Sequence, residues 1–437
     1  MKPELSKHFQ SRKPSAIRIA QIEFSKRTDE VDAVNVAIGN VSLPMHPAMQ
    51  ERMRNLGAEN SPFTKGVVKY SATIGEKETN DAFLHIISSS GFDTTQLYSQ
   101  ITDGGSQAME LVILGVCGDA SSKNKPLLLI DAAYTNYQAI ADRLSRKTIA
   151  VTRKLDYDGN FAYPDINDME EQIQKHKPSA VVVIPYDNPT GHFYTHEALV
   201  EICKLAVKYN MWIISDEAYR ELFYTDDKVT SIWGVTEEDV PGITGRRISI
   251  ETASKVWNAC GLRIGAIVTD NAEFNQRAVA ENTANLCPNV IGQYIFGALE
   301  NLSLADLQNW YGQQREYYAS MLNEFSRSIH LLIPDIIVSR PAASIYSVID
   351  VRNIVDENFD ASQFVLYCAQ KGFVDINGEK KTLLVSPLAE FYHVEDLKNN
   401  PGRTQMRIAY VESPETMKLV PRLFAELLEK YLGREFL

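Results

Sequence analysis

The sequence predicts an α/β protein: a large domain with a mainly parallel central sheet flanked by helices, and a smaller α+β domain. Three observations support this fold class. Short apolar segments alternate with helical patterns in the middle of the chain, and polar residues follow the apolar segments. After about residue 300 this alternation gives way to a long helical stretch and short strands. Alternation of strands and helices is typical of parallel sheets with helices packed on their faces.

Several apolar segments of the middle region have the length and composition of buried strands. They cover residues 127–131, 181–185, 212–217, 247–251 and 265–270. Between the second and the third, Thr195 is placed to cap a helix that carries Leu199 and Ile202 on its apolar face. Open α/β sheets bind ligands beyond the carboxyl ends of their strands, so the polar residues there are the candidates for a site.

The last third of the chain has a different pattern. A helical stretch over 304–327 precedes short strands near 336–338, 345–351 and 404–411. A C-terminal helix is expected to begin at the N-cap Ser413 and to be kinked by Pro421. We expect three units: an N-terminal arm over 1–50 that packs with the small domain, a large ligand-binding domain over 51–305, and a small C-terminal domain over 306–437.

Composition excludes several classes of partner. The 437 residues carry a net charge of -12 with a pI near 5.3, which argues against nucleic acid and anionic membranes. Five scattered cysteines without a CxxC pair favour reduced thiols in a cytosolic protein. No apolar segment reaches the roughly 18 residues of a membrane span, and the first 25 residues lack the core of a signal peptide. We therefore expect a cytoplasmic protein.

The histidines do not predict a metal site. His192 and His196 have HxxxH spacing, but no acidic or cysteine partner completes a cluster near them. Both are interpreted as loop residues, and no metal is expected.

Two short motifs at strand ends carry chemistry. Lys255 follows Ser254 after the strand over 247–251, and a partly buried lysine there can act as a nucleophile toward carbonyls. Asp216 directly follows a buried strand, where a carboxylate needs a partner such as a ring-nitrogen cation, and Tyr219 lies in the same turn. The alternatives are a solvated surface lysine and a carboxylate that caps the next helix.

Two further motifs are turns with possible ligand contacts. Asn188 begins an Asn-Pro-Thr-Gly turn that can aim its side chain into a site, although most such tetrapeptides are only turns. Gly105 and Ser106 precede a helix over 109–117 and can present free N–H groups to a phosphate. The segment has neither a Walker A nor a GxGxxG pattern, and it can also be an ordinary helix start.

Together and in this order, the motifs resemble those of fold type I pyridoxal-phosphate enzymes, specifically the class I/II aminotransferases of the aspartate and aromatic type. The resemblance runs from about residue 39 to 410, and the combination of Asn-Pro-Thr-Gly, Asp-Glu-x-Tyr and a lysine eight residues before an arginine is specific. It implies a pyridoxal 5'-phosphate cofactor and ping-pong exchange of an amino group between an amino acid and a 2-oxo acid such as 2-oxoglutarate.

The resemblance also implies roles for individual residues. Lys255 would hold the cofactor as a Schiff base (aldimine) and shuttle a proton. Asp216 would pair with the ring nitrogen, and Asn188 and Tyr219 would bond the ring hydroxyl. The remaining cofactor contacts would come from Tyr134, stacked on the ring, and from the phosphate ligands Gly105, Ser106, Thr252, Ser254 and Arg263.

The substrate and the neighbouring subunit are implied in the same way. Arg407, Gly39 and Asn188 would surround the substrate α-carboxylate. Tyr70 would reach the phosphate of a neighbouring subunit, which implies a homodimer with shared active sites. The segment from Ser15 to Arg18 resembles the family's mobile arm.

Some features depart from the family pattern or stay open. The family often has Pro-x-Gly-Gly where this chain has Pro341-Ala342-Ala343-Ser344, and Ala132 stands where a proline usually follows the strand-end aspartate. An acidic or aromatic amino acid is expected as substrate, with Arg18 or Lys65 as the cation for a distal carboxylate. Two alternatives are a C–S lyase or synthase on the same scaffold and a non-catalytic regulator, the latter without an added DNA-binding domain.

Overall fold

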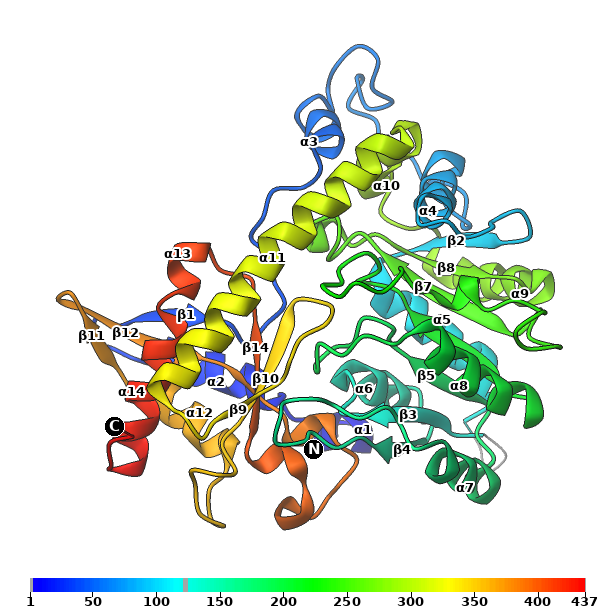
Figure 1. Cartoon of the computed structure of the whole chain (residues 1–437). Helices are drawn as coiled ribbons and strands as arrows, with labels where there is room; N and C mark the ends of the chain where they lie inside the picture. The colour runs from blue at the N-terminus through cyan, green and yellow to red at the C-terminus, as the bar shows by residue number, and fades with distance from the viewer. Residues whose placement is uncertain (1–2, 121–124, 437) are drawn as a thin grey trace.

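The computed structural model describes residues 3–120 and 125–436, which form one large sheet and two small ones (Figure 1). The large sheet has the strand order β2-β8-β7-β6-β5-β3-β4. Its strands are β2 (Tyr98–Thr102), β3 (Leu127–Asp131), β4 (Thr148–Thr152), β5 (Ala180–Val183), β6 (Trp212–Asp216), β7 (Arg247–Thr252) and β8 (Gly265–Thr269). From β7 to β4 the pairs are parallel, so the sheet is mainly parallel, as predicted.

The strand β8 is antiparallel to both of its neighbours, β7 and β2. The alternation of apolar segments with helical patterns had predicted it as one more strand of the parallel sheet. A parallel return requires a crossover connection, usually a helix. The link from β7 to β8 contains only a 3₁₀ turn, Cys260–Leu262, and this short link carries Lys255 and Arg263.

Both faces of the sheet are buried. Leu127 and Leu129 of β3 pack in one cluster with α5 (Gly104–Cys117) and α6 (Thr135–Arg143), while Leu128 and Ile130 point into the larger core on the opposite face. That larger core includes α4 (Lys77–Ser89), α7 (Ile166–His176) and α8 (His196–Lys208), and α9 (Ala272–Asn282) adds to the first cluster. Burial on two faces explains why these strands are continuous apolar segments rather than alternating ones.

Two details of the helices differ from the sequence interpretation: the first residue of α5 and the place of His196. The helix α5 begins at Gly104, five residues earlier than predicted, so Gly105 and Ser106 lie in its first turn. In α8, Thr195 is the N-cap, and its hydroxyl accepts a hydrogen bond from the Ala198 N–H at 3.4 Å. His196 is therefore the first residue of a helix and not a loop residue.

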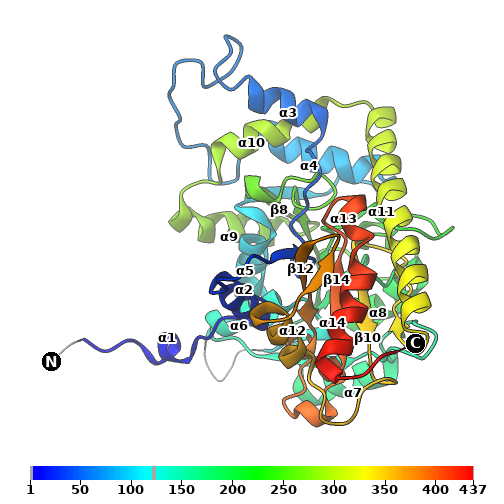
Figure 2. The ribbon, with the colours of Figure 1, turned by 90° about the vertical axis from the view of Figure 1, so that its left-hand side faces the viewer.

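The second part of the fold combines both ends of the chain (Figures 1 and 2). One small sheet has the order β1-β12-β11, and the other β13-β14-β10-β9. The strands are β1 (Asp32–Asn35), β9 (Ile337–Val338), β10 (Tyr346–Asp350), β11 (Val374–Ile376), β12 (Glu379–Leu384), β13 (Ser386–Pro387) and β14 (Gln405–Ala409). Because β1 pairs in parallel with β12, the N-terminal segment belongs structurally with the C-terminal part.

Helices complete this part. The short α1 (Lys7–Ser11) extends from the body, and α2 (Ala16–Ser25) packs against α12 (Ala361–Gln370), as Figure 2 shows. The long α11 (Leu304–Leu332) starts with a capping box at Ser303 and runs from α3 (Pro47–Arg54) and α10 (Val290–Gly297) toward the C-terminal helices. The domain boundaries proposed above stay a prediction.

The C-terminal region contains two helices, α13 (Pro414–Met417) and α14 (Val420–Leu432), where the sequence predicted a single kinked one. Ser413 caps the first helix, as expected. Pro421 lies in the first turn of α14, where the missing N–H has no intrahelical acceptor to lose. The chain therefore restarts a helix at this point and does not bend one.

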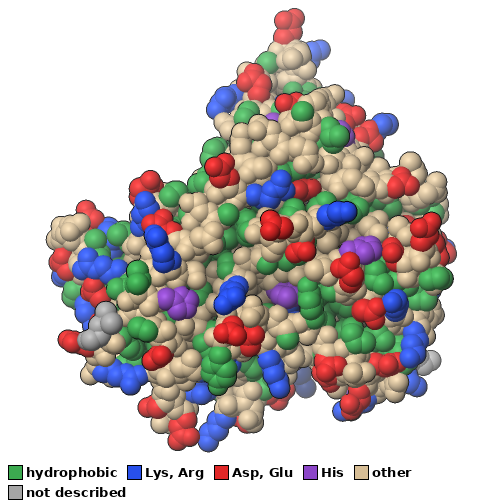
Figure 3. All heavy atoms as spheres, in the orientation of Figure 1, with side chains coloured by type: hydrophobic (Ala, Val, Ile, Leu, Met, Phe, Trp, Pro, Cys, Tyr) green, Lys and Arg blue, Asp and Glu red, His purple; other side chains and the backbone are tan. Residues whose placement is uncertain are grey.

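The visible surface in Figure 3 mixes acidic and basic side chains across the face. None of the helices within residues 3–120 and 125–436 is long and apolar enough to cross a membrane.

Candidate active site

A cavity of about 350 Å³ lies where the large sheet meets the small sheets. Ligand pockets in proteins begin at about this size. The residues from the sequence prediction that line it are Gly39, Gly105, Ser106, Tyr134, Asn188, Asp216, Tyr219, Thr252, Ser254, Lys255, Arg263 and Arg407. The predicted phosphate ligand Tyr70 does not line it, and its side chain is 78% exposed.

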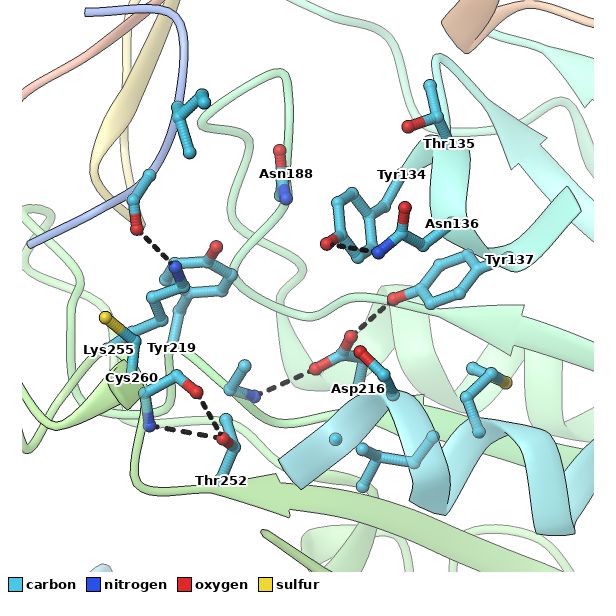
Figure 4. A pocket seen from close by; sticks show the side chains of 18 of the residues that line it. Tyr134, Thr135, Asn136, Tyr137, Asn188, Asp216, Tyr219, Thr252, Lys255 and Cys260 are labelled. Atoms are coloured by element: carbon cyan, nitrogen blue, oxygen red, sulfur yellow. Dashed lines mark hydrogen bonds between the residues drawn. The ribbon is translucent and has the colours of Figure 1, made fainter. Parts of the chain in front are cut away.

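Lys255 lies just beyond the carboxyl end of β7 and points into the cavity (Figure 4). Its Nζ donates to the Gly39 carbonyl at 2.5 Å. A Cβ at Gly39 would lie 2.1 Å from the Tyr346 hydroxyl, so a side chain at this position would collide with that tyrosine. The turn before Lys255 is held by Thr252, whose hydroxyl is 2.7 Å from that of Ser254 and accepts from its N–H at 3.1 Å.

Asp216 ends β6 and faces the cavity from below the lysine (Figure 4). Its Oδ2 accepts a hydrogen bond from the Tyr137 hydroxyl at 2.5 Å, and its Oδ1 accepts from the Ala218 N–H at 3.1 Å. Burial raises the pKa of Asp216, and these two hydrogen bonds lower it in part. A carboxylate in this position is stabilised by any cation that enters the cavity.

Tyr137 was not predicted as a site residue. It lies in the first turn of α6, three residues after Tyr134, so the two rings contact each other edge to face with centroids 5.4 Å apart. Burial raises the pKa of Tyr137 far above its ordinary value, so the hydroxyl keeps its proton and acts as a donor. The only sequence signal was the spacing of one helical turn from Tyr134.

Arg407 on β14 is buried, with an exposed fraction of 4%. Its guanidinium donates to Asn188 Oδ1 at 2.8 Å and to the Ala37 carbonyl at 2.7 Å, and it lies 4.4 Å from the centre of the Tyr346 ring. Within the described part of the chain, no carboxylate pairs with Arg407, and its Nε has no hydrogen-bond partner. A buried cation without a counter-ion is costly, so this arrangement fits an anionic ligand.

A second anion site lies at the start of α5. Gly105 and Ser106 place free N–H groups of the first turn at the cavity, at the positive end of the helix dipole. Gly104 has φ +77°, and a Cβ there would lie 2.3 Å from the Arg263 guanidinium. Arg263 therefore packs directly on the backbone that opens the helix, and it donates to the Cys260 carbonyl at 3.0 Å.

Two tyrosine hydroxyls complete the wall beside Lys255. Tyr219 and Tyr346 are 2.9 Å apart through their hydroxyl oxygens. Burial raises the pKa of Tyr219 well above its ordinary value, and the nearby Tyr346 raises it further. Tyr346 was missed by the sequence analysis, because it begins a buried strand in a segment without a recognisable motif.

Tyr134 also lines the cavity. Burial raises the pKa of Tyr134 to about 12, and Asn136 donates to its hydroxyl at 2.8 Å.

Buried ion pairs hold the site from behind. Arg153 donates to Asp187 Oδ2 at 2.5 Å, and Thr190 donates to the same oxygen, which fixes the turn that carries Asn188. Below Asp216 and Lys255, Arg220 forms two hydrogen bonds of 2.9 Å with Glu251. No group of three or more His, Cys, Asp or Glu side chains is arranged to hold a metal in the described ranges.

The family model described as "Aminotransferase class I and II" matches residues 32–418, which is most of the chain. The chain belongs to the class I and II aminotransferase family. This result confirms the family predicted from the sequence, and with it the predicted pyridoxal phosphate cofactor.

Individual relatives are distant. The chain is 24% identical over 280 residues to the glutamate-pyruvate aminotransferase AlaA of Escherichia coli, an alignment that covers 62% of the chain and 61% of the relative. Putative aminotransferase YugH of Bacillus subtilis is 25% identical over 235 residues, 53% of the chain and 57% of the relative. The chain thus spans about 60% of the length of these curated relatives.

A solved structure matches over nearly the full length. A mutant aspartate aminotransferase of Thermus thermophilus superposes with a TM-score of 0.78 at 20% identity, covering 98% of this chain and 100% of that one. At this identity the likeness shows the fold. It confirms the fold type I class of this aminotransferase-family protein.

Proposed function

We propose that this chain is a pyridoxal-phosphate-dependent aminotransferase that exchanges the amino group between an amino acid and a 2-oxo acid in two half-reactions. The observation that carries the proposal is the buried Arg407, which lacks a carboxylate partner in the described structure and lies across the cavity from a second anion site at the start of α5. Lys255 and Asp216 lie in the same cavity.

The residues present fit the cofactor. The first turn of α5, with Thr252, Ser254 and Arg263, forms a cradle for a phosphate, because free N–H groups, hydroxyls and a guanidinium converge there. Lys255 is the amine for covalent attachment, and Asp216 is the carboxylate that keeps a ring nitrogen protonated. When bound, the cofactor supplies a reactive carbonyl and an electron-accepting ring.

The chain's own groups then have defined tasks. Arg407 binds the α-carboxylate of the substrate in a planar, two-bond contact, and Asn188 orients that guanidinium by accepting from it at 2.8 Å. Lys255 Nζ moves a proton to and from the substrate α-carbon. Tyr219, protonated at neutral pH, would donate a hydrogen bond to the bound cofactor, and Tyr134 would contact its ring.

The proposed substrates are an acidic or aromatic amino acid, with glutamate and 2-oxoglutarate as one pair. The relative AlaA is described as a glutamate-pyruvate aminotransferase, and the Thermus neighbour as an aspartate aminotransferase, which supports an acidic partner. A C–S lyase or synthase would use the same cofactor contacts but would leave the cofactor in a different form after reaction with an amino acid.

The test is a half-reaction. The holoenzyme is mixed with single amino acids, without a 2-oxo acid, and cofactor absorbance is recorded. A transaminase converts the cofactor to its amine form and releases a 2-oxo acid in equal amount, whereas a lyase or synthase regenerates the starting spectrum. Lys255→Ala should lose both the absorbance of the attached cofactor and turnover. Near wild-type transamination by Lys255→Ala would refute the assignment of the lysine.

We further propose a homodimer with shared sites, located in the cytoplasm. Tyr70 is 78% exposed and lies on a segment with two exposed apolar residues, Val67 and Val68, which supports a contact with a second copy. Sedimentation of the holoenzyme at micromolar concentration tests this. A fully active monomer would contradict it, as would a Tyr70→Phe variant that keeps wild-type cofactor affinity.

A further inference from the structure

The described side chains that line the cavity carry more positive than negative charge. The cations are Lys255, Arg263, Arg407 and Arg18, and Asp216 is the one carboxylate among the described lining residues. The proposed function uses three of the cations, for cofactor attachment, phosphate binding and the α-carboxylate. Arg18 is the cation without an assigned ligand.

Arg18 also lacks an acidic partner in the protein. Its side chain donates to Gln21 Oε1 at 3.0 Å, and no ion pair of Arg18 is present within the described ranges. Asp216 is engaged elsewhere, by Tyr137 and by the Ala218 N–H. A guanidinium at a cavity wall with only a neutral amide as partner is available to an anionic ligand.

The position of Arg18 is fixed by the docking of α2. The Ala16 N–H donates to both oxygens of Glu390, at 3.2 and 3.3 Å, and Ser15 caps the helix through the Arg18 N–H. Farther along the same segment, the Arg27 guanidinium donates to the carbonyls of Cys368 and Gly372. These contacts fix the first turn of α2 to the turn around Glu390 and the segment after α2 to α12, so Arg18 is held at the cavity rather than on a free tail.

The neighbours of Arg18 define the ligand that fits. Ile17 is half-buried and lines the cavity beside Arg18 and Ser15, so it offers an apolar contact before the charge. Lys65, the other cation considered for this role from the sequence, does not line the cavity, whereas Arg18 does, although both side chains are exposed. The structure therefore separates the two candidates and leaves Arg18.

We propose that Arg18 selects amino acids with an acidic side chain by binding the carboxylate at the far end of the substrate. The inference rests on the proposed function, in which Arg407 holds the α-carboxylate. With one guanidinium for each carboxylate and the apolar Ile17 in the same lining, the cavity takes a short dicarboxylic amino acid, such as glutamate or aspartate.

The test compares substrates that differ only in the distal group. We compare kcat/KM for glutamate with that for norvaline, which has the same number of carbons but no distal carboxylate, in the wild type and in Arg18→Gln. The ratio of the two values should fall about 10–100-fold in Arg18→Gln, the size of a charge-assisted hydrogen bond. Arg18→Lys should restore part of the ratio. Arg12→Gln removes an exposed arginine from the same arm, outside the cavity, and should leave the ratio at its wild-type value.

A binding measurement makes the result independent of turnover. Calorimetry of the holoenzyme with glutarate and with pentanoate should show the same 10–100-fold loss of preference in Arg18→Gln. An unchanged preference in both assays overturns the proposal. Faster reaction with O-phosphoserine than with glutamate overturns it in favour of a phosphate-bearing side chain. If no amino acid converts the cofactor, the proposed function fails, and the glutarate result still decides the role of Arg18.

Discussion

The hydrogen bond between Tyr137 and Asp216 makes a quantitative prediction. The variant Tyr137→Phe keeps the ring and its edge contact with Tyr134 and removes only the hydroxyl that lies 2.5 Å from Asp216 Oδ2. Burial raises the pKa of Asp216, and the bond from Tyr137 is the larger of the two hydrogen bonds that lower it. Its removal therefore raises the pKa of Asp216 further.

The magnitude follows from the strength of the bond. A hydrogen bond to a charged group contributes about 1.5–3 kcal/mol, and one pKa unit corresponds to about 1.4 kcal/mol. Asp216 must be ionised to hold a ring proton, and a higher pKa leaves it protonated over a wider acidic range. The acidic limb of the pH–rate profile should therefore move to higher pH by about 1–2 units.

The assay is kcat/KM over a range from weakly acidic to weakly alkaline pH, for the wild type and for Tyr137→Phe. Tyr163→Phe is the control, because its hydroxyl donates to the Phe193 carbonyl at 3.2 Å and does not line the cavity. An acidic limb at the same pH in wild type and Tyr137→Phe would refute control of Asp216 by Tyr137. A shift of the same size in Tyr163→Phe would show that the change is not specific.

Three further predictions concern charge at and behind the site. Asp216→Asn should retain the cofactor but lose far more than tenfold in kcat, and a loss below tenfold, about 1.4 kcal/mol, would mean that another group holds the ring proton. Burial and the nearby Arg153 lower the pKa of His192 from 6.5 to about 3, so the unfolded chain binds the proton more readily over that range. The free energy of unfolding should therefore fall as pH drops from 6.5 toward 3, by up to about 1.4 kcal/mol per pH unit. Urea unfolding at several pH values should show that this free energy depends less steeply on pH in His192→Asn than in the wild type. An equal dependence on pH in the two proteins contradicts this. Arg153→Met leaves the carboxylate of Asp187 buried and unpaired and should lower the free energy of unfolding by about 3–5 kcal/mol, whereas a change below about 1 kcal/mol would show that the pair is not structurally important.

The location of the site could be predicted from sequence because most of its parts are local motifs at strand ends. Lys255 after β7, Asp216 at the end of β6, and Gly105 with Ser106 at the start of α5 are each marked by a short pattern. Their order along the chain then indicates one ligand. The structure brings these residues to one cavity, while their individual roles remain proposals.

The parts that sequence could not provide depend on contacts between distant residues. Tyr346 meets Tyr219 across 127 positions, and nothing in the apolar strand around Tyr346 signals that contact. The antiparallel direction of β8 arises because the link between β7 and β8 contains no crossover helix. The apolar pattern of the strands does not indicate whether such a helix is present. Likewise, an inserted proline can bend a helix or begin a new one, and at Pro421 the packing of α14 decides the outcome.

The pairing of β1 with β12 affects how the protein is made. Asn35 pairs with Leu384, so at about 5–20 residues per second a ribosome needs roughly 20–70 s to supply the partner strand. Every strand of the large sheet has been synthesised by Thr269, so that sheet can form while β1 still lacks its partner strand β12. Closing so long a loop adds an entropic cost that grows only slowly with length. The arm that carries Arg18 is thus synthesised long before the strand that ties it to the small sheets.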